Sequence, residues 1–190
     1  MKEDLCMEDK LNKYEWVKTM VIVVVVTIAI RTFLFTPVSV DGASMEPTLH
    51  DREKIIVSKT INWIGDIHRG DIVIIKDPEE KINYVKRVIG LPGETIAMEN
   101  DHLQVNGKEI DESYLTEAKK ITNQHGTKLT EDFEPVTVPK DQYFVMGDNR
   151  PNSMDSRGAA PFSLGFIPEN EIIGKSKFVI FPIQNIRMTH

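Results

Sequence analysis

Ser44 and Lys86 are the residues whose surroundings best suit nucleophilic catalysis. Ser44 follows the small residues Gly42 and Ala43, which would let a substrate backbone approach closely, and Pro47 stiffens the turn beyond it. A serine nucleophile needs a base to remove its proton. None of the five histidines stands out for that role, because each lies in a polar or turn-like context. Taken alone, Ser44 indicates no more than an ordinary turn serine.

Lys86 lies in an apolar run, Ile82–Ile89, where a charged side chain is costly unless it has a task. A lysine with a pKa near 10.4 is almost wholly protonated at pH 7, but desolvation can lower that value by roughly 3–5 units. Arg87 has apolar neighbours too, so alternation alone does not choose between them. Only Lys86 can lose its proton and act as a base. A structural ion pair remains the alternative role for Lys86.

A polar loop, Gly147–Arg157, follows an apolar stretch. A calcium-binding loop that began at Asp148 would need glycine at its sixth position and glutamate at its twelfth, where Ser153 and Ala159 stand. We therefore predict no metal and no cofactor. Acidic residues and arginines alternate here, so Asp148, Asp155 and Arg157 could brace the loop and present Ser153 to a neighbouring element.

Residues 19–38 form the one apolar segment of membrane length, and as a helix it would span roughly 30 Å. The excess of lysines before it favours a cytoplasmic tail over 1–18, with the rest outside the membrane. Ser44 would then lie about six residues, or at most roughly 20 Å, beyond the bilayer. A cleaved signal peptide is the alternative, but the nearest cleavage site, after Ala43, would place Asp41 where a small residue is needed.

Residues 39–190 contain short β-branched runs separated by turn signals, so we predict a mostly β domain. Asn106–Gly107 is the strongest hairpin signal, and residues 112–134 form a polar surface excursion without a pattern. The net charge of −6 argues against nucleic-acid binding, and the single Cys6 excludes an intramolecular disulfide. The predicted strands are Lys54–Ser58, Asp71–Lys76, Tyr84–Ile89, Thr95–Met98, His102–Val105, Gln142–Met146 and Lys177–Phe181.

Four stretches behind the apolar segment resemble the motifs of bacterial type I signal peptidases (leader peptidases). The similarity runs from about Trp16 to Pro182, and four motifs in the family's order are highly specific. A single anchor and a modest excursion resemble the compact Gram-positive form. The stretches are Ser44–Leu49 (SMEPTL), Arg69–Ile74 (RGDIVI), Lys86–Gly93 (KRVIGLPG) and Gly147–Arg157 (GDNRPNSMDSR).

The resemblance implies an antiparallel, coiled-sheet or barrel-like catalytic domain behind one transmembrane helix, with no cofactor. Ser44 would be the acylating nucleophile, Lys86 the general base, and Ser153 the residue that orients the lysine. The substrates would be exported preproteins cut after Ala-x-Ala-like motifs at the outer face of the plasma membrane, close to the bilayer and the export machinery. Matching positions for substrate binding are Val38, Val40, Met45, Leu49, Tyr84 and Val85, and those that brace the loop are Asp148, Arg150, Asp155 and Arg157.

Three positions depart from the family pattern. Gly42 stands where some members carry a serine that helps bind the oxyanion, so the backbone N–H of Ser44 would need another partner there. Pro151 stands where an acid is common, which removes one expected ion pair. Residues 158–164 form a longer link than usual after Arg157 and would reshape a rim of the site.

Two other functions fit parts of the sequence. A dedicated Ser/Lys maturation protease on a similar fold would ignore generic preproteins, and a non-enzymatic anchored β module would not react with an acylating probe at Ser44. A self-cleaving repressor would need a DNA-binding motif, but only 18 polar residues precede the apolar segment.

Overall fold

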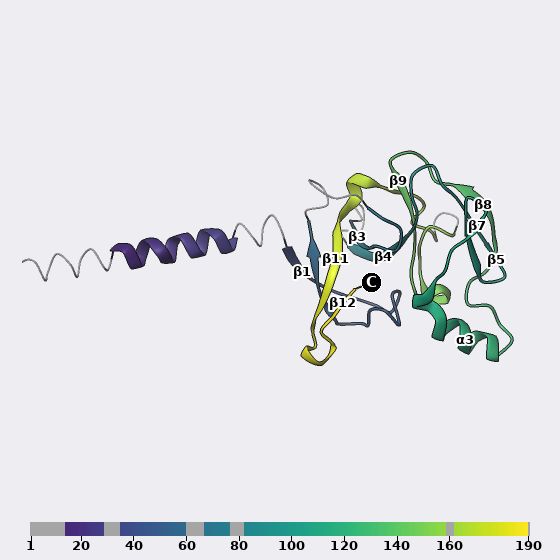
Figure 1. The fold of residues 1–190 in the computed structure, drawn as a ribbon, viewed down its shortest axis with the longest axis horizontal. Helices are drawn as coiled ribbons and strands as arrows, with labels where there is room; N and C mark the ends of the chain where they lie inside the picture. The colour runs from purple at the N-terminus through teal and green to yellow at the C-terminus, as the bar shows by residue number, and fades with distance from the viewer. Residues whose placement is uncertain (1–13, 29–34, 60–66, 77–81, 159–161, 190) are drawn as a thin grey trace, which may run out of the picture. The chain divides into compact units, whose positions relative to one another are not determined.

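The computed structural model describes residues 14–28, 35–59, 67–76, 82–158 and 162–189 (Figure 1). The predictions for Cys6, for most of the 1–18 tail and for part of the 158–164 link therefore lie outside the described residues. The chain divides into two compact units, Met1–Thr36 and Pro37–His190. The described strands are β1 (Phe35–Ser39), β2 (Lys54–Ser58), β3 (Ile72–Lys76), β4 (Asn83–Gly90), β5 (Thr95–Glu99), β6 (His102–Val105), β7 (Lys108–Glu109), β8 (Phe133–Thr137), β9 (Gln142–Met146), β10 (Ile167–Pro168), β11 (Ile172–Phe181) and β12 (Arg187–Met188). The helices are α3 (Thr116–Gln124) and the 3₁₀ turns η1 (Ser113–Leu115), η2 (Arg150–Asn152), η3 (Glu169–Glu171) and η4 (Ile183–Asn185).

The N-terminal unit contains a helix over residues 14–28 whose side chains are exposed. Among the described residues, no helix combines the length and the apolar character needed to cross a bilayer. The predicted membrane helix over 19–38 is wrong at its C-terminal end, because Phe35–Ser39 form β1. Pro37 would break a helix but is tolerated in an edge strand, and β1 lies at one end of the sheet order.

The larger sheet of the described chain runs in the order β1-β2-β11-β3-β4-β9-β10, with β12 paired to β11. The neighbours from β2 to β10 are antiparallel. Figure 1 shows the long yellow strand β11 beside β3 although nearly 100 residues separate them in sequence. β4 therefore lies between β3 and β9, in the interior of the sheet.

A smaller sheet, β7-β6-β5-β8, is inserted between β4 and β9. Its pairs are antiparallel. The predicted hairpin at Asn106–Gly107 is confirmed: both residues have positive φ, 52° and 73°, and the loop joins β6 to β7. This is the backbone geometry of the tightest hairpin turns, which asparagine and glycine favour.

The mostly β, antiparallel fold class is confirmed. Each of the seven predicted strands coincides with an observed strand, although the last begins five residues earlier, at Ile172. The sequence did not reveal this longer β11 because Gly174 and Ser176 interrupt its apolar pattern. It also did not reveal β8, where Glu134 and Pro135 break the run.

The stretch 112–134 is not patternless. It contains η1 and α3, and α3 has no buried residue, in agreement with a surface position. The two ends are different, because Glu112, Leu115 and Thr130 are buried. The segment therefore has an exposed middle and two anchored ends.

The core beneath the larger sheet should tolerate loss of volume poorly. Ile74 lies in the middle of β3, is fully buried, and packs with residues of β2, β4 and β11. Ile74→Ala should lower the free energy of unfolding by about 2–5 kcal/mol, because it removes buried apolar surface and leaves a cavity. Denaturant unfolding of the detergent-solubilised protein measures this change. Ile121→Ala, at a 56% exposed position on α3, is the matched control and should shift the midpoint little. Equal effects of both substitutions would contradict the assigned core.

Candidate active site

Ser44 and Lys86 are in direct contact. Lys86 Nζ lies 2.8 Å from Ser44 Oγ and donates to it. Ser44 belongs to the turn between β1 and β2, and Lys86 lies in the middle of β4, so residues 42 positions apart in sequence meet here. The four described histidines are exposed, and none of them has a recorded hydrogen bond to Ser44. Within the described chain, Lys86 is the group placed to take the proton of Ser44.

The environment of Lys86 favours its neutral form. Lys86 is only 2% exposed, and its ammonium end lies 5.7 Å from the centre of the Tyr84 ring. Burial lowers the pKa of Lys86 to about 8, since an ammonium group loses its hydration there. Asp155 opposes this decrease, whereas the positive charge of Arg157 adds to it.

Asn149 holds the peptide units on both sides of the Ser44 Cα. Its backbone N–H donates to the Ser44 carbonyl at 3.0 Å, and its side-chain Nδ2 donates to the Ala43 carbonyl at 2.9 Å. The polar loop thus fixes the backbone of the candidate nucleophile. The sequence carries no signal for this role of Asn149, because an asparagine in a polar loop does not reveal a partner about a hundred residues away.

Gly42 does not offer an obvious donor for an oxyanion. Its backbone N–H donates to Asp51 Oδ1 at 2.8 Å, and its φ of +92° suits glycine. Glycine has no hydroxyl to replace the serine that the resemblance places at this position in some members, as the sequence already indicated. The N–H of Ser44 has no recorded partner among the described residues.

Ser153 lies next to the candidate nucleophile but does not hydrogen-bond to Lys86. Its Oγ is buried and has no partner in the described chain. Gly147 separates the two serines tightly: a Cβ on Gly147 would lie 2.2 Å from Ser153 Oγ and 2.4 Å from the Ser44 carbonyl oxygen. Only glycine fits between them, so the loop and the Ser44 turn are closely packed.

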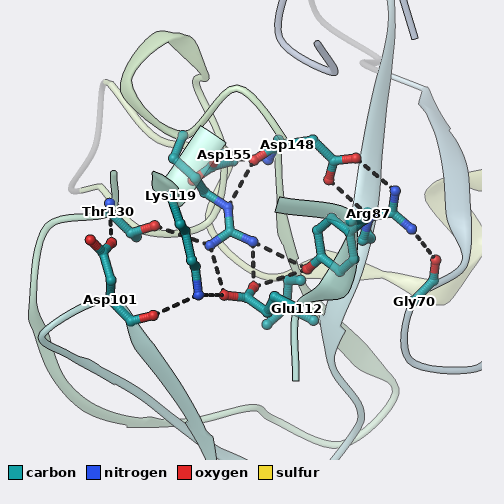
Figure 2. A network of polar contacts seen from close by, with 12 residues as sticks. Gly70, Arg87, Asp101, Glu112, Lys119, Thr130, Asp148 and Asp155 are labelled. Atoms are coloured by element: carbon teal, nitrogen blue, oxygen red, sulfur yellow. Dashed lines mark hydrogen bonds and ion pairs between the residues drawn. The ribbon is translucent and has the colours of Figure 1, made fainter. Parts of the chain in front are cut away.

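Three ion pairs hold the polar loop, but they differ from the pairs expected within it. Asp155 pairs with Arg157 at 2.9 Å, whereas Asp148 pairs with Arg87 of β4 at 2.6 Å (Figure 2). Arg150 pairs with Glu112 at 2.5 Å. The sequence left the role of Arg87 open, and the structure assigns it to this bidentate contact with Asp148. Two loop residues are therefore tied to elements outside the loop.

The six predicted substrate-binding residues are mostly buried. Val38 and Tyr84 keep part of their surface exposed. The other four belong to the core beneath the Ser44 turn, where Met45 and Leu49 are 1% and 0% exposed. The buried four are Val40, Met45, Leu49 and Val85.

Two positions at which the sequence departs from the family pattern, Pro151 and the link 158–164, can be located in part. Pro151 is exposed at the start of η2, where a missing N–H costs nothing. Phe162 is 81% exposed and borders a cavity of about 380 Å³ that Ser153 and Arg150 also line. A large exposed ring thus lies at the rim beside the loop.

Comparison with known proteins identifies the family. The description "Signal peptidase, peptidase S26" matches residues 13–181, which include Ser44, Lys86 and the polar loop. The chain belongs to the signal peptidase family, peptidase S26.

Curated relatives match almost the whole chain. A signal peptidase I from Bacillus amyloliquefaciens is 55% identical over 181 residues, which are 95% of this chain and 92% of the relative. One from Bacillus licheniformis is 50% identical over 189 residues and all of both chains. The crystal structure of a signal peptidase I from Enterococcus faecalis matches with a TM-score of 0.52 at 36% identity, over 59% of this chain and 97% of the other.

Breaking the pair Arg87–Asp148 on one side should destabilise the protein strongly, because both side chains are at most 1% exposed. Asp148→Asn leaves the Arg87 guanidinium buried without a compensating charge and should lower the free energy of unfolding by about 3–5 kcal/mol. Urea unfolding measures the difference. Asp132→Asn, in the exposed pair with Lys128, is the matched control and should have little effect. A stable Asp148→Asn protein would show that the buried pair does not hold the loop.

Proposed function

We propose that this protein is an endopeptidase that removes N-terminal signal peptides from exported preproteins, with Ser44 as nucleophile and Lys86 as general base. The observation that carries the proposal is the 2.8 Å contact between Lys86 Nζ and Ser44 Oγ. Membership of the signal peptidase family supports the reaction class. The relatives named signal peptidase I support the substrate class.

Each step of the reaction can be assigned to these two side chains. Neutral Lys86 accepts the hydroxyl proton of Ser44 while Oγ attacks the scissile carbonyl carbon. The resulting ammonium group donates its proton to the leaving amine, and the C–N bond breaks to leave an ester on Ser44. Lys86 then takes a proton from water, which attacks the ester, and the proton returns to Ser44 Oγ as the acid product leaves.

The negative charge that develops on the substrate carbonyl oxygen needs hydrogen-bond donors. The backbone N–H of Ser44 is the proposed first donor, since Asn149 fixes the peptide units around it. The N–H of Gly42 is bonded to Asp51, so the proposed second donor is a backbone group elsewhere. Ser153 is proposed to assist Lys86 when substrate closes the site, because its buried Oγ has no partner in the described chain.

The preference for small residues before the cleaved bond follows from the packing under the Ser44 turn. Val40, Met45, Leu49 and Val85 form part of a close-packed core, which leaves little room for a large side chain. Val38 and Tyr84 are proposed to contact the substrate at the edge of this core. A methyl group fits such a shallow apolar surface, whereas a larger side chain would require repacking.

We also propose that the apolar N-terminal segment anchors the enzyme in the plasma membrane. Val21 to Val26 are between 49% and 58% exposed on a helix, which suits contact with lipid rather than water. The lysine excess before the segment supports an orientation with the N-terminus in the cytoplasm and residues 39–190 outside. Because β1 begins at Phe35, the proposed anchor ends before that residue rather than at residue 38.

Removal of either reacting group should abolish cleavage. Ser44→Ala and Lys86→Ala should each lower kcat for a signal-peptide-bearing preprotein by about 10³-fold or more, since the two groups act as a unit. The assay follows product by gel after incubation with detergent-solubilised protein. Ser113→Ala and Lys120→Ala, at exposed positions, are the matched controls and should cleave normally.

Activity that survives both active-site substitutions would contradict the assigned chemistry. Absence of cleavage by the unmodified protein would instead favour a dedicated substrate over general preproteins.

The pH dependence should report the ionisation of Lys86. Only the neutral amine accepts a proton, and its pKa is about 8, so the inactive charged form prevails at lower pH. Below pH 8, kcat/KM should fall about tenfold per pH unit, and above it should reach a plateau. Initial rates between about pH 6 and 10 measure the profile. A rate that still rises at pH 10 would show that Lys86 keeps an ordinary lysine pKa.

A further inference from the structure

Glu112 is buried at the start of the segment that carries η1 and α3, far in sequence from both reacting groups. We propose that Glu112 is a positioning residue: through Arg150 it fixes the Gly147 peptide against the backbone of Ser44. This inference rests on the proposed function, because it assigns the positioning role to the same reaction. No sequence motif indicates Glu112, which stands at the start of the predicted surface excursion 112–134.

The carboxylate of Glu112 is fully engaged. It is 4% exposed, and Oε1 accepts from Arg150 Nη2 at 2.5 Å and from the Tyr114 hydroxyl at 2.9 Å. Oε2 accepts from Lys119 Nζ at 3.0 Å (Figure 2). Arg150 and Lys119 hold the pKa of Glu112 below its usual value despite burial. The side chain is therefore a fixed, charged anchor point.

Arg150 connects Glu112 to the polar loop. It is 2% exposed, and its Nε donates to the Gly147 carbonyl at 3.1 Å. Its own carbonyl accepts from Arg157 Nη2 at 2.6 Å. Glu112 is the only carboxylate with a recorded ion pair to Arg150 among the described residues, so the position of the guanidinium depends on it.

Gly147 packs directly against the backbone of Ser44. The clearance around it is so small that a Cβ there would lie 2.4 Å from the Ser44 carbonyl oxygen. The Gly147 N–H also donates to Asp155 Oδ2 at 3.0 Å. A shift of this peptide must therefore move Ser44 or separate the loop from it, and small displacements of reacting groups reduce catalysis strongly.

Tyr114 extends the contact to the other side of the loop. Its hydroxyl donates to Glu112, and its ring lies 4.0 Å from the centre of the Arg87 guanidinium. Arg87 in turn binds Asp148 through two hydrogen bonds. Glu112 and Tyr114 thus contact the two arginines that flank Gly147–Asp148.

The far end of the segment supports the same guanidinium. Thr130 Oγ1 accepts from Arg150 Nη1 at 3.1 Å. The carboxylate of Asp101 fixes this threonine by accepting from the N–H groups of Leu129 and Thr130, at 2.9 and 2.6 Å. Lys119 joins both parts, since it donates to Glu112 and to the Asp101 carbonyl (Figure 2).

Glu112→Gln tests the proposal with little change of shape. It removes the charge that holds Arg150, so kcat for preprotein cleavage should fall about 10-fold or more while KM stays within about twofold. Thr130→Val removes one weaker contact to Arg150 and should lower kcat about threefold. Glu117→Gln, exposed in the first turn of α3, is the matched control and should cleave like the unmodified protein. Rates are measured well below each variant's unfolding temperature.

A double variant shows whether Glu112 acts through Arg150. If it does, Glu112→Gln combined with Arg150→Met should be no slower than Arg150→Met alone. Independent, additive losses would overturn the proposed route.

A purely structural role would lower the unfolding temperature of Glu112→Gln but leave kcat within twofold, and this outcome would overturn the proposal. If Glu112→Gln does not fold, Thr130→Val decides, and an unchanged kcat there rejects it. Failure of the unmodified protein to cleave would reject the proposed function itself, and the role of Glu112 with it.

Discussion

The site depends on keeping a lysine amine neutral beside a serine hydroxyl. Burial in the middle of β4 supplies this condition, because an ammonium group without hydration is disfavoured and the pKa of Lys86 decreases to about 8. Strands β3 and β9 flank β4 within the sheet, and the polar loop that follows β9 supplies the charges that act on Lys86, those of Asp155 and Arg157. This loop is therefore part of the chemistry, although it carries neither the nucleophile nor the base.

The opposite face of β4 holds the polar loop in position. Arg87 points away from Lys86 and binds Asp148, at the start of the loop that packs on Ser44. Buried ion pairs add little net stability, but they specify geometry, because breaking one leaves an uncompensated charge. Arg87–Asp148 and Arg150–Glu112 thus fix the loop from two sides. Asn149, between them, can then hold the Ser44 backbone.

Local sequence patterns predicted the strands well, because each of these strands contains a few consecutive β-branched residues. The seven predicted runs and the Asn106–Gly107 hairpin agree with the structure. The pairing of Ser44 with Lys86 came from the family resemblance rather than from a local pattern, and the two side chains are in contact. The partners of the buried charges could not be predicted in this way. Arg87 and Asp148 are 61 positions apart, and Arg150 and Glu112 are 38 apart, so only the fold brings them together.

Errors arose where one stretch satisfies two patterns. Residues 35–38 continue an apolar run and so extended the expected membrane helix, yet the same residues form the edge strand β1. The polar composition of 112–134 correctly indicated an exposed α3. The same polar composition gave no indication that Glu112 and Thr130 are buried. Their burial is possible because the fold brings both side chains into contact with Arg150. Composition describes the average environment of a segment rather than that of its anchoring residues.

A direct titration of Lys86 tests the central claim. Lysine side chains labelled with carbon-13 can be followed by NMR in the detergent-solubilised protein, and the Lys86→Met spectrum identifies the signal. The account predicts a midpoint near pH 8, well separated from the other lysines. A midpoint near 10.4, the value of an exposed lysine, would contradict it, because burial would then not be what prepares Lys86 to act as a base.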